Sequence, residues 1–421
     1  MRKPATPTRS RHGLIAALDV GTTKVCCFIA RAEGALEPRI IGIGHQVSYG
    51  LRCGAIVDMD EAEAAIRSTV ETAEHMAGEN IRQVIVNLSG HQQASRLIAY
   101  EISIAGHQVG DADLRRILDQ DNLLQDQPEN YELVHSIPVG YSIDGNRGVR
   151  DPRGMYGQRL GVNMHVIAAN AGPIRNLETT VSRCHLEIES KVSSPLASAL
   201  ACLTDDEKKL GVTYIDMGGG TTSIAVFFDG ELVHTDCIPI GGNHVTTDIA
   251  RGLATPLSQA ERIKTLHGSA IPSVSDDRET IMVPPIGEDG SSEPYQVPRS
   301  MLVGIIRPRL EETFEMVRTR LEDAGFDKVA GRQVVLAGGA AQLPGARDLA
   351  GLILDKQVRM GRLLPFEGLA ESVSGPAFAT CAGLLRYAMM NSSQKTEKAF
   401  RPAEEPASRF GRIGQWMREN F

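Results

Sequence analysis

One short pattern occurs twice in this chain and constrains the fold more than any other feature. Residues 18–23 (LDVGTT) match residues 215–222 (IDMGGGTT): an apolar residue, Asp, an apolar residue, a glycine turn and Thr-Thr. Further apolar runs follow at 25–30 and 224–228, so each copy predicts a β-hairpin with its glycines at the bend. The repetition predicts two similar α/β halves.

These turns offer the chemistry that the phosphates of a nucleotide require. Glycine lets the backbone approach closely, so that its N–H groups and the Thr hydroxyls can donate to phosphate oxygens. A carboxylate at a strand end can hold Mg²⁺ through waters, so Asp19 and Asp216 are expected to hold one Mg²⁺ from opposite sides. The residues expected around the phosphates are Gly21, Thr22, Thr23, Lys24, Gly218, Gly219, Gly220, Thr221 and Thr222. An ordinary hairpin turn is the alternative for either copy alone, but two copies in matching context favour the nucleotide.

A third glycine turn follows an apolar strand at 333–337. Gly338, Gly339 and Ala340 form its bend, and an apparent helix begins at Pro344, so that helix N-terminal amides favour an anion or the adenosine side of a nucleotide. A plain strand-to-helix turn is the alternative. The chain contains no Gly-Lys, which excludes a Walker A loop, and no GxGxxG follows a strand.

Composition limits the class of protein. With 421 residues, 23% charged and 42% hydrophobic, the chain predicts a folded protein of several subdomains. The net charge of -8 argues against general nucleic-acid binding. Seven scattered cysteines predict reduced thiols, and no segment approaches the ~20 apolar residues of a membrane span, so the body is expected in the cytosol. The basic residues 1–12 are interpreted as a disordered tail, because Asp19 interrupts the apolar run that a signal peptide needs.

Together the three turns resemble the phosphate-1, phosphate-2 and adenosine motifs of the superfamily of actin, sugar kinases and heat-shock chaperone ATPases. Residues 241–250 (GGNHVTTDIA) and 253–264 (LATPLSQAERIK) are similar to the FtsA family of bacterial cell-division proteins, and this resemblance covers about residues 13–390 and the C-terminal tail. It implies that Glu261 and Lys264, one helical turn apart, contact the adenosine, and it adds Asn243 to the nucleotide site. A solvated helix pair is the alternative for Glu261 and Lys264.

One departure from related ATPases concerns catalysis. Several of them place a catalytic Glu before Pro at the start of the helix that follows the interdomain crossing, whereas this chain has Ser194 before Pro195. Serine has no carboxylate to orient or deprotonate a water molecule. The sequence therefore predicts ATP binding with at most slow hydrolysis, and no residue is assigned as catalytic.

The resemblance implies an α/β, actin-like (ribonuclease H-like) duplicated two-domain fold with two small inserted subdomains and a C-terminal amphipathic helix. Composition adds a flexible linker after the fold and irregular surface structure at 271–298. The expected boundaries are 13–87, 167–205 and 364–390 for the first half, 206–245 and 302–363 for the second, 88–166 for the insert, 246–301 for the small nucleotide and partner subdomain, 391–406 for the linker and 407–421 for the helix.

The last residues, 407–421 (ASRFGRIGQWMRENF), predict a membrane-surface helix. Drawn as a helix, they place an apolar face between arginines, which suits the headgroup region of an anionic membrane. They are too short to cross a bilayer. The residues expected to contact lipid are Phe410, Ile413, Trp416, Met417 and Phe421. A terminal helix packed on the protein's own core is the alternative, although the FtsA family is similar here too.

The resemblance implies an ATP- and Mg²⁺-binding protein of the division site, on the cytoplasmic face of the bacterial inner membrane. Its implied partners are further copies of itself, membrane lipids, other division proteins and the C-terminal peptide of the tubulin-like protein FtsZ, and not nucleic acid. Arg299 and Arg309 flank an apolar run at 301–306 and are expected to pair with that peptide's carboxylates, unless they are solvated surface charges. A small-molecule kinase of the same superfamily is the alternative function, and the actin-like protein of pilus-assembly machines, which normally lacks the tail, is a third.

Overall fold

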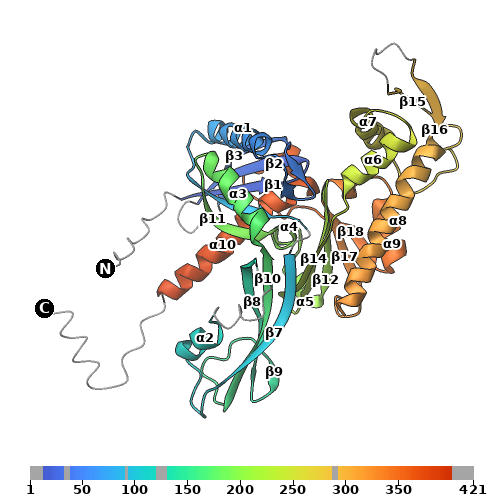
Figure 1. The fold of residues 1–421 in the computed structure, drawn as a ribbon. Coiled ribbons are helices and arrows are strands. Elements are labelled where there is room, and N and C mark those ends of the chain that lie inside the picture. The colour runs from blue at the N-terminus through green and yellow to red at the C-terminus, as the bar shows by residue number, and fades with distance from the viewer. Residues whose placement is uncertain (1–12, 33–37, 91–92, 120–129, 287–292, 401–421) are drawn as a thin grey trace.

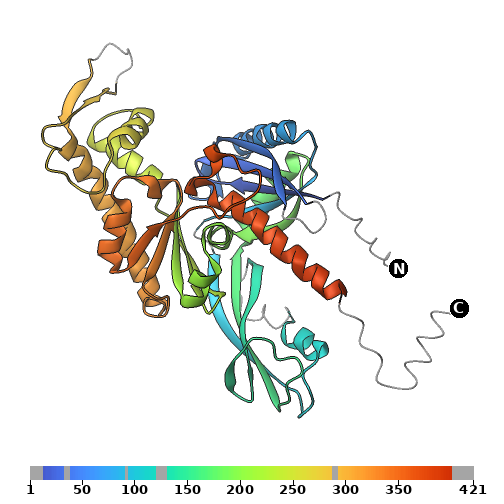
Figure 2. The same ribbon diagram turned by 180° about the vertical axis from the view of Figure 1, so that it is seen from behind.

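A computed structural model describes residues 13–32, 38–90, 93–119, 130–286 and 293–400, and the arrangement is shown in Figures 1 and 2. Two five-stranded sheets form the two halves of the body, with the orders β11-β6-β1-β2-β3 and β14-β13-β12-β17-β18. The strands of the first sheet are β1 Leu14–Val20, β2 Lys24–Arg31, β3 Arg39–Val47, β6 Gln83–Leu88 and β11 Glu187–Ser193. Those of the second are β12 Val212–Met217, β13 Thr222–Phe228, β14 Glu231–Ile238, β17 Gln333–Ala337 and β18 Gln357–Met360.

The two sheets share one topology. In each, three antiparallel strands that follow one another along the chain are extended by two strands that run parallel to the first. The predicted hairpins are the first two strands of each sheet: β1 pairs with β2 and β12 with β13. The two similar α/β halves predicted from the repeat are therefore confirmed at the level of strand order.

Helices cover both faces of each sheet. On the first sheet, α1 (Met59–Ala77) and α3 (Ala171–Arg183) pack on one face, and α4 (Ser194–Cys202) and α10 (Ala379–Phe400) on the other. All of α4 is buried, and it packs against strands of both sheets. A Cβ at Gly383 of α10 would lie 1.6 Å from the carbonyl oxygen of Ala197, so glycine is what allows these two helices to approach so closely.

Two smaller units extend from the body (Figure 1). The first is a four-stranded sheet of order β7-β10-β8-β9 with its own small core. Its elements are β7 Gln93–Ser103, α2 Asp111–Ile117, β8 Tyr131–Ile143, β9 Asn146–Val149 and β10 Arg159–Asn170. The second lies at the far end of the second half and contains α6 Gly242–Gly252, α7 Leu257–His267, β15 Thr280–Val283, β16 Tyr295–Pro298 and the start of α8 Arg299–Asp323.

The remaining elements are short, apart from α9. They are β4 Leu51–Arg52, β5 Ala55–Ile56, α5 Asp205–Leu210, the 3-10 turns Ala340–Gln342, Glu371–Val373 and Pro376–Phe378, and α9 Ala346–Leu354. Within the described part of the chain, no helix is both long enough and apolar enough to cross a membrane.

The structure corrects three sequence-based expectations. The segment 391–406 was expected to be a linker, but α10 continues to Phe400, because residues 391–400 contain several good helix formers and neither Gly nor Pro. The stretch 271–298 is not wholly irregular, because β15 pairs with β16 inside it. After the third glycine turn, a 3-10 turn intervenes and α9 begins at Ala346, not Pro344.

Candidate nucleotide site

The two repeated turns face each other across the gap between the halves. Each turn is closed by the same kind of bond, Gly21 N–H to the Lys24 carbonyl at 3.0 Å and Gly218 N–H to the Thr221 carbonyl at 2.8 Å. A Cβ at Gly219 would lie 2.2 Å from Cγ2 of Thr23. Only glycine therefore allows the second turn to come this close to the first.

A cleft with an empty volume of about 790 Å³ opens between these turns. It brings together both predicted carboxylates, Asp19 and Asp216, and most of the residues expected at the phosphates. Those that line it are Gly21, Thr22, Thr23, Lys24, Gly218, Gly219, Gly220 and Thr221, and Gly338 and Gly339 of the third turn line it too. Thr222 is the exception, because it is buried in β13 and its hydroxyl donates to the Ile240 carbonyl at 2.8 Å.

A second space of about 1070 Å³ adjoins the first and shares Thr23, Gly219 and Gly339 with it. The predicted adenosine residues Asn243, Glu261, Lys264 and Ala340 line this space. The Lys264 ammonium donates to Oε2 of Glu261 at 2.6 Å and to Oγ1 of Thr246 at 2.8 Å. These bonds connect α6 to α7 and hold the mostly buried Lys264 at the edge of the space, while the Glu261 side chain is 51% exposed.

The third glycine turn lies between these two spaces. Gly338 has a left-handed backbone (φ +89°), and a Cβ there would lie 2.4 Å from Oδ1 of Asp216. A side chain at this position would therefore displace the Asp216 carboxylate. All three turns recognised in the sequence thus meet at one place.

The two carboxylates lie in a setting that favours binding of a cation. Burial raises the pKa of Asp19 to about 7, with a further increase from the charge of Asp216 and a decrease from Lys24. Burial also raises the pKa of Asp216, against hydrogen bonds from Ser198 and Thr380. The residues fit a hydrated Mg²⁺ with phosphates, because two carboxylates face a cleft lined by glycines. A Cβ at Gly219 or Gly338 would collide with Thr23 or Asp216, so these positions need glycine. Among the described residues, no group of three or more His, Cys, Asp or Glu side chains could hold a metal.

Lys24 makes contacts that link the first turn to the last helix. Its ammonium donates to the Ala377 carbonyl at 2.6 Å and lies 3.3 Å from the ring centroid of Phe378. Both partners belong to the turn that precedes α10. Lys24 thus lines the phosphate part of the cleft from a position fixed by residues far along the chain.

The raised pKa of Asp19 predicts a pH-dependent stability for the nucleotide-free chain. Because the pKa is higher in the folded chain than in the unfolded one, the folded chain keeps a proton that the unfolded chain loses between about pH 4 and 7, so the free energy of unfolding falls as pH rises through this window. Asp19→Asn should therefore stabilise the chain by on the order of 4 kcal/mol at pH 8 and by clearly less at pH 5. Urea unfolding at both pH values measures this, and an equal gain at both would contradict it.

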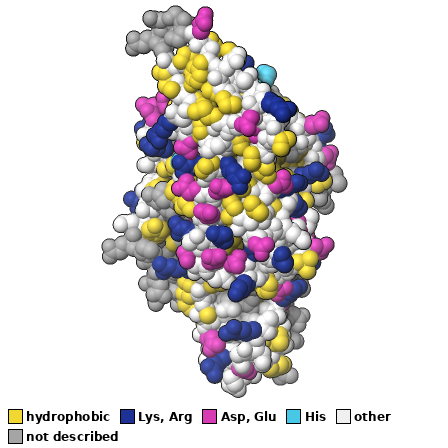
Figure 3. All heavy atoms as spheres, turned by 90° about the vertical axis from the view of Figure 1, so that its right-hand side faces the viewer, with side chains coloured by type: hydrophobic (Ala, Val, Ile, Leu, Met, Phe, Trp, Pro, Cys, Tyr) yellow, Lys and Arg dark blue, Asp and Glu magenta, His cyan; other side chains and the backbone are white. Residues whose placement is uncertain are grey.

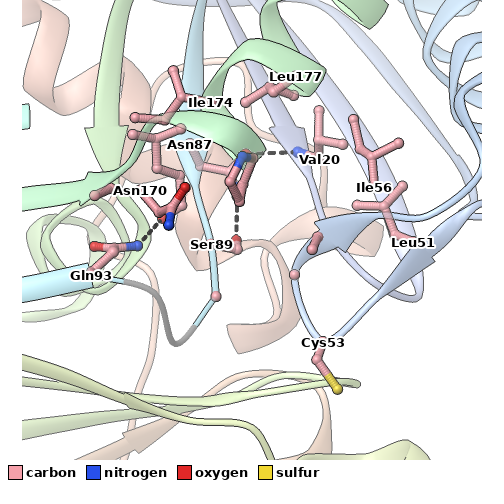
Figure 4. A pocket seen from close by; sticks show the side chains of 16 residues that line it. Val20, Leu51, Cys53, Ile56, Asn87, Ser89, Gln93, Asn170, Ile174 and Leu177 are labelled. Atoms are coloured by element: carbon pink, nitrogen blue, oxygen red, sulfur yellow. Dashed lines mark hydrogen bonds between the residues drawn. The ribbon is translucent and has the colours of Figure 1, made fainter. Parts of the chain in front are cut away.

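Asn87 and Ser89 belong to the site and were missed from the sequence. Asn87, near the end of β6, accepts from the Val20 N–H at 2.7 Å and donates to Ser89 at 3.0 Å (Figure 4). It also donates to Ser194 at 3.2 Å. The Ser194 hydroxyl also lies 2.9 Å from the Leu88 carbonyl, to which it donates. This network joins the end of β6 to the end of β1 and to the start of α4. In the sequence, the only sign of this role is the position of Asn87 near the end of a strand.

The network also separates the cleft from a mostly apolar pocket behind it. Figure 4 shows this pocket between Asn87 and the side chains of Leu51, Ile56, Ile174 and Leu177. Ser194 lines the phosphate side, where the acidic residues among the described lining are Asp19 and Asp216. No further carboxylate takes the place of the missing glutamate in that described lining.

The two predicted partner residues lie outside the cleft, on α8, and are paired within the chain. Arg299 forms an ion pair with the buried Asp276, and its Nε donates to the His267 carbonyl at 2.9 Å. Arg309 contacts both oxygens of Asp248 on α6, at 2.6 and 3.1 Å. Both side chains are mostly buried, so neither is a solvated surface charge. The predicted lipid-contacting residues 410–421 lie outside the described residues.

Comparisons with known proteins give the family. The family model "Cell division protein FtsA" matches residues 213–383, and "SHS2 domain inserted in FTSA" matches residues 90–168. The chain is similar to the cell division protein FtsA of Agrobacterium fabrum, with 44% identity over 100% of this chain and 97% of the relative. It is similar to that of Escherichia coli K12, with 32% identity over 97% and 98%.

Solved structures support the fold alone. The chain is similar to the "PilM-PilN type IV pilus biogenesis complex", with a TM-score of 0.63 and 17% identity over 89% of this chain and 98% of that one. It is also similar to MreB5 of Spiroplasma citri bound to ADP, with a TM-score of 0.54 and 15% identity over 91% and 98%. The actin-like fold that the sequence resemblance implies is therefore confirmed.

Proposed function

Because the chain belongs to the FtsA family of cell-division proteins, we propose that it binds Mg-ATP between its two halves, assembles with further copies on the cytoplasmic face of the bacterial inner membrane at the division site, and anchors FtsZ there. The observation that carries the nucleotide part is the meeting of three glycine turns and two carboxylates at one cleft. The membrane part rests on the apolar and arginine pattern of residues 407–421.

The residues of the chain divide the task of holding the nucleotide. Backbone N–H groups of the two hairpin turns donate to phosphate oxygens, and the space beside Glu261 and Lys264 receives the adenosine. Asp19 and Asp216 would hold Mg²⁺ through its waters, and the ion would neutralise phosphate charge. Because the turns come from different halves, a nucleotide would hold the halves together.

The serine at position 194 disfavours a small-molecule kinase as the function, and it also predicts slow ATP turnover. Ser194 stands where related ATPases have a carboxylate and donates to the Leu88 carbonyl, so this position is not suited to activate water or a substrate hydroxyl. We expect turnover below ~1 s⁻¹, the low end of ordinary enzymes, unchanged by added sugars or carboxylic acids. Phosphate release by the purified chain measures this. A large acceleration by one small substrate would indicate a kinase instead.

The small subdomain offers a surface for the FtsZ peptide. It exposes Val274, Met282, Ile286 and Met301, and Figure 3 shows hydrophobic side chains gathered at that end of the molecule. An apolar surface of this kind marks an interaction site. We propose that the acidic peptide binds here, beside Arg299 and Arg309.

Substitution of Arg309 tests this, with Asp248→Asn as the matched control. Arg309→Glu should lower the affinity for a labelled FtsZ tail peptide at least tenfold, about 1.4 kcal/mol, because a carboxylate contact is replaced by repulsion. Asp248→Asn breaks the same internal ion pair but keeps the arginine, so it should bind the peptide as well as the wild type. Arg299→Glu and Asp276→Asn form the second pair. Fluorescence anisotropy decides: equal losses in both members of each pair would mean that the arginines act only on the fold.

A further inference from the structure

A groove lies where the insert, the second sheet and the last helix meet. Its empty volume is about 1440 Å³, and it is lined by residues of β8, α4, the β13–β14 hairpin and α10. Leu196, Leu200, Phe227 and Leu232 are buried residues among its lining, and Tyr387 and Met390 of α10 line it too. Figures 1 and 2 show α10 leaving the body beside the insert. The groove thus combines polar groups with apolar side chains, of which Met390, at its edge, is 51% exposed.

The groove carries acidic groups at its edge. Asp205 and Glu231 line it, and Asp229, two residues before Glu231 in the same hairpin, pairs with Arg150 at 2.9 Å. Partial burial and the charge of Asp229 raise the pKa of Glu231, although Arg150 lowers it. The negative charge of the Glu231 carboxylate is therefore only partly stabilised by solvent and by Arg150. Lys208 also lines the groove and pairs with Asp205 at 3.1 Å. An occupant with apolar side chains and arginines would suit this surface.

The chain's own tail has these properties and is within reach. Residues 407–421 carry five apolar residues together with Arg409, Arg412 and Arg418. The part of α10 between Met390, in the groove, and Phe400, at its end, spans about 15 Å. The intervening residues 401–406 can extend up to about 20 Å. The tail can therefore return along α10 to the groove.

We propose that residues 407–421 occupy this groove when no membrane is present. Aromatic and aliphatic side chains of the tail contact the apolar side chains of the groove, and an arginine of the tail pairs with Glu231. This inference rests on the proposed function, because the same apolar residues are those assigned to lipid. One face cannot contact groove and bilayer together, so the groove competes with the membrane and reduces premature attachment.

Trp416 reports on the occupied groove directly, because it is the only Trp in the chain. The full chain in buffer should emit at shorter wavelength than a synthetic peptide of residues 401–421. Met390→Asp and Glu231→Lys should each shift the emission toward that of the peptide. The controls Leu352→Asp and Glu71→Lys change exposed residues elsewhere and should leave it unchanged.

Binding to anionic phospholipid vesicles gives the second readout. Only molecules whose tail has left the groove can bind vesicles, so the apparent affinity for vesicles is the intrinsic affinity multiplied by that fraction of molecules. Both groove variants should therefore bind vesicles roughly five- to tenfold more tightly than the wild type and the controls. A wild-type spectrum equal to that of the peptide, or groove variants with unchanged vesicle affinity, would overturn the proposal. So would an emission shift that grows with protein concentration, because it would place the tail in a second copy. A chain that never binds vesicles but keeps the shifted emission would instead refute the membrane function.

Discussion

Replacing Asp216 by alanine is expected to weaken binding of Mg-ATP at least tenfold, about 1.4 kcal/mol or more. Asp216 ends β12 at the second glycine turn, and a Cβ at Gly338 would lie only 2.4 Å from its Oδ1, so its carboxylate is confined at the meeting point of the turns. Its removal leaves Asp19 as the acidic group on the described phosphate side. Isothermal titration calorimetry with Mg-ATP measures the loss.

The same titration without magnesium separates the metal from the fold. If Asp216 acts through Mg²⁺, Asp216→Ala should bind metal-free ATP at least as well as the wild type does, because a negative charge near the phosphates has been removed. Asp216→Asn, which can keep hydrogen bonds with Ser198 and Thr380, should behave like the alanine variant in both titrations. Equal losses with and without magnesium would mean that Asp216 only supports the turn.

Deleting residues 407–421 is expected to abolish attachment to anionic vesicles. The deleted segment lies beyond α10, which ends at Phe400, and outside the nucleotide cleft, so the affinity for nucleotide should stay within error of the full chain. Trp416→Ala and Met417→Glu should each weaken attachment partially, since each removes part of the apolar face. Vesicle flotation is the measurement. A truncated chain that floats as well as the wild type would refute the membrane function of the tail.

The sequence could predict the fold and the phosphate turns because their signals are local. One or three glycines followed by two threonines after an apolar strand predict a hairpin without information from elsewhere, and the repetition of the pattern predicts the duplicated topology. The third turn was found for the same reason. Only Thr222 among the phosphate residues was misplaced, because the sequence does not show that its hydroxyl turns toward Ile240.

Contacts between distant residues could not be predicted in this way. Lys24 meets Ala377 and Phe378, and Asn87 meets Ser194, only after the chain has folded. The arginines on α8 were interpreted as free to bind a partner because Asp276 and Asp248, with which they pair, lie on other segments of the chain, although Arg309 also pairs with Glu312 on α8 itself. The continuation of α10 was missed because a polar composition describes solvent exposure and does not exclude a helix.

Flotation of FtsZ with anionic vesicles, in the presence of the chain and Mg-ATP, tests the proposed tether function most directly. FtsZ should rise with the vesicles when the full chain is present, and it should stay in the dense fraction without the chain or with the chain truncated at residue 406. If FtsZ stays in the dense fraction while the full chain itself floats, the chain attaches to the membrane but does not anchor FtsZ, and the central claim is wrong.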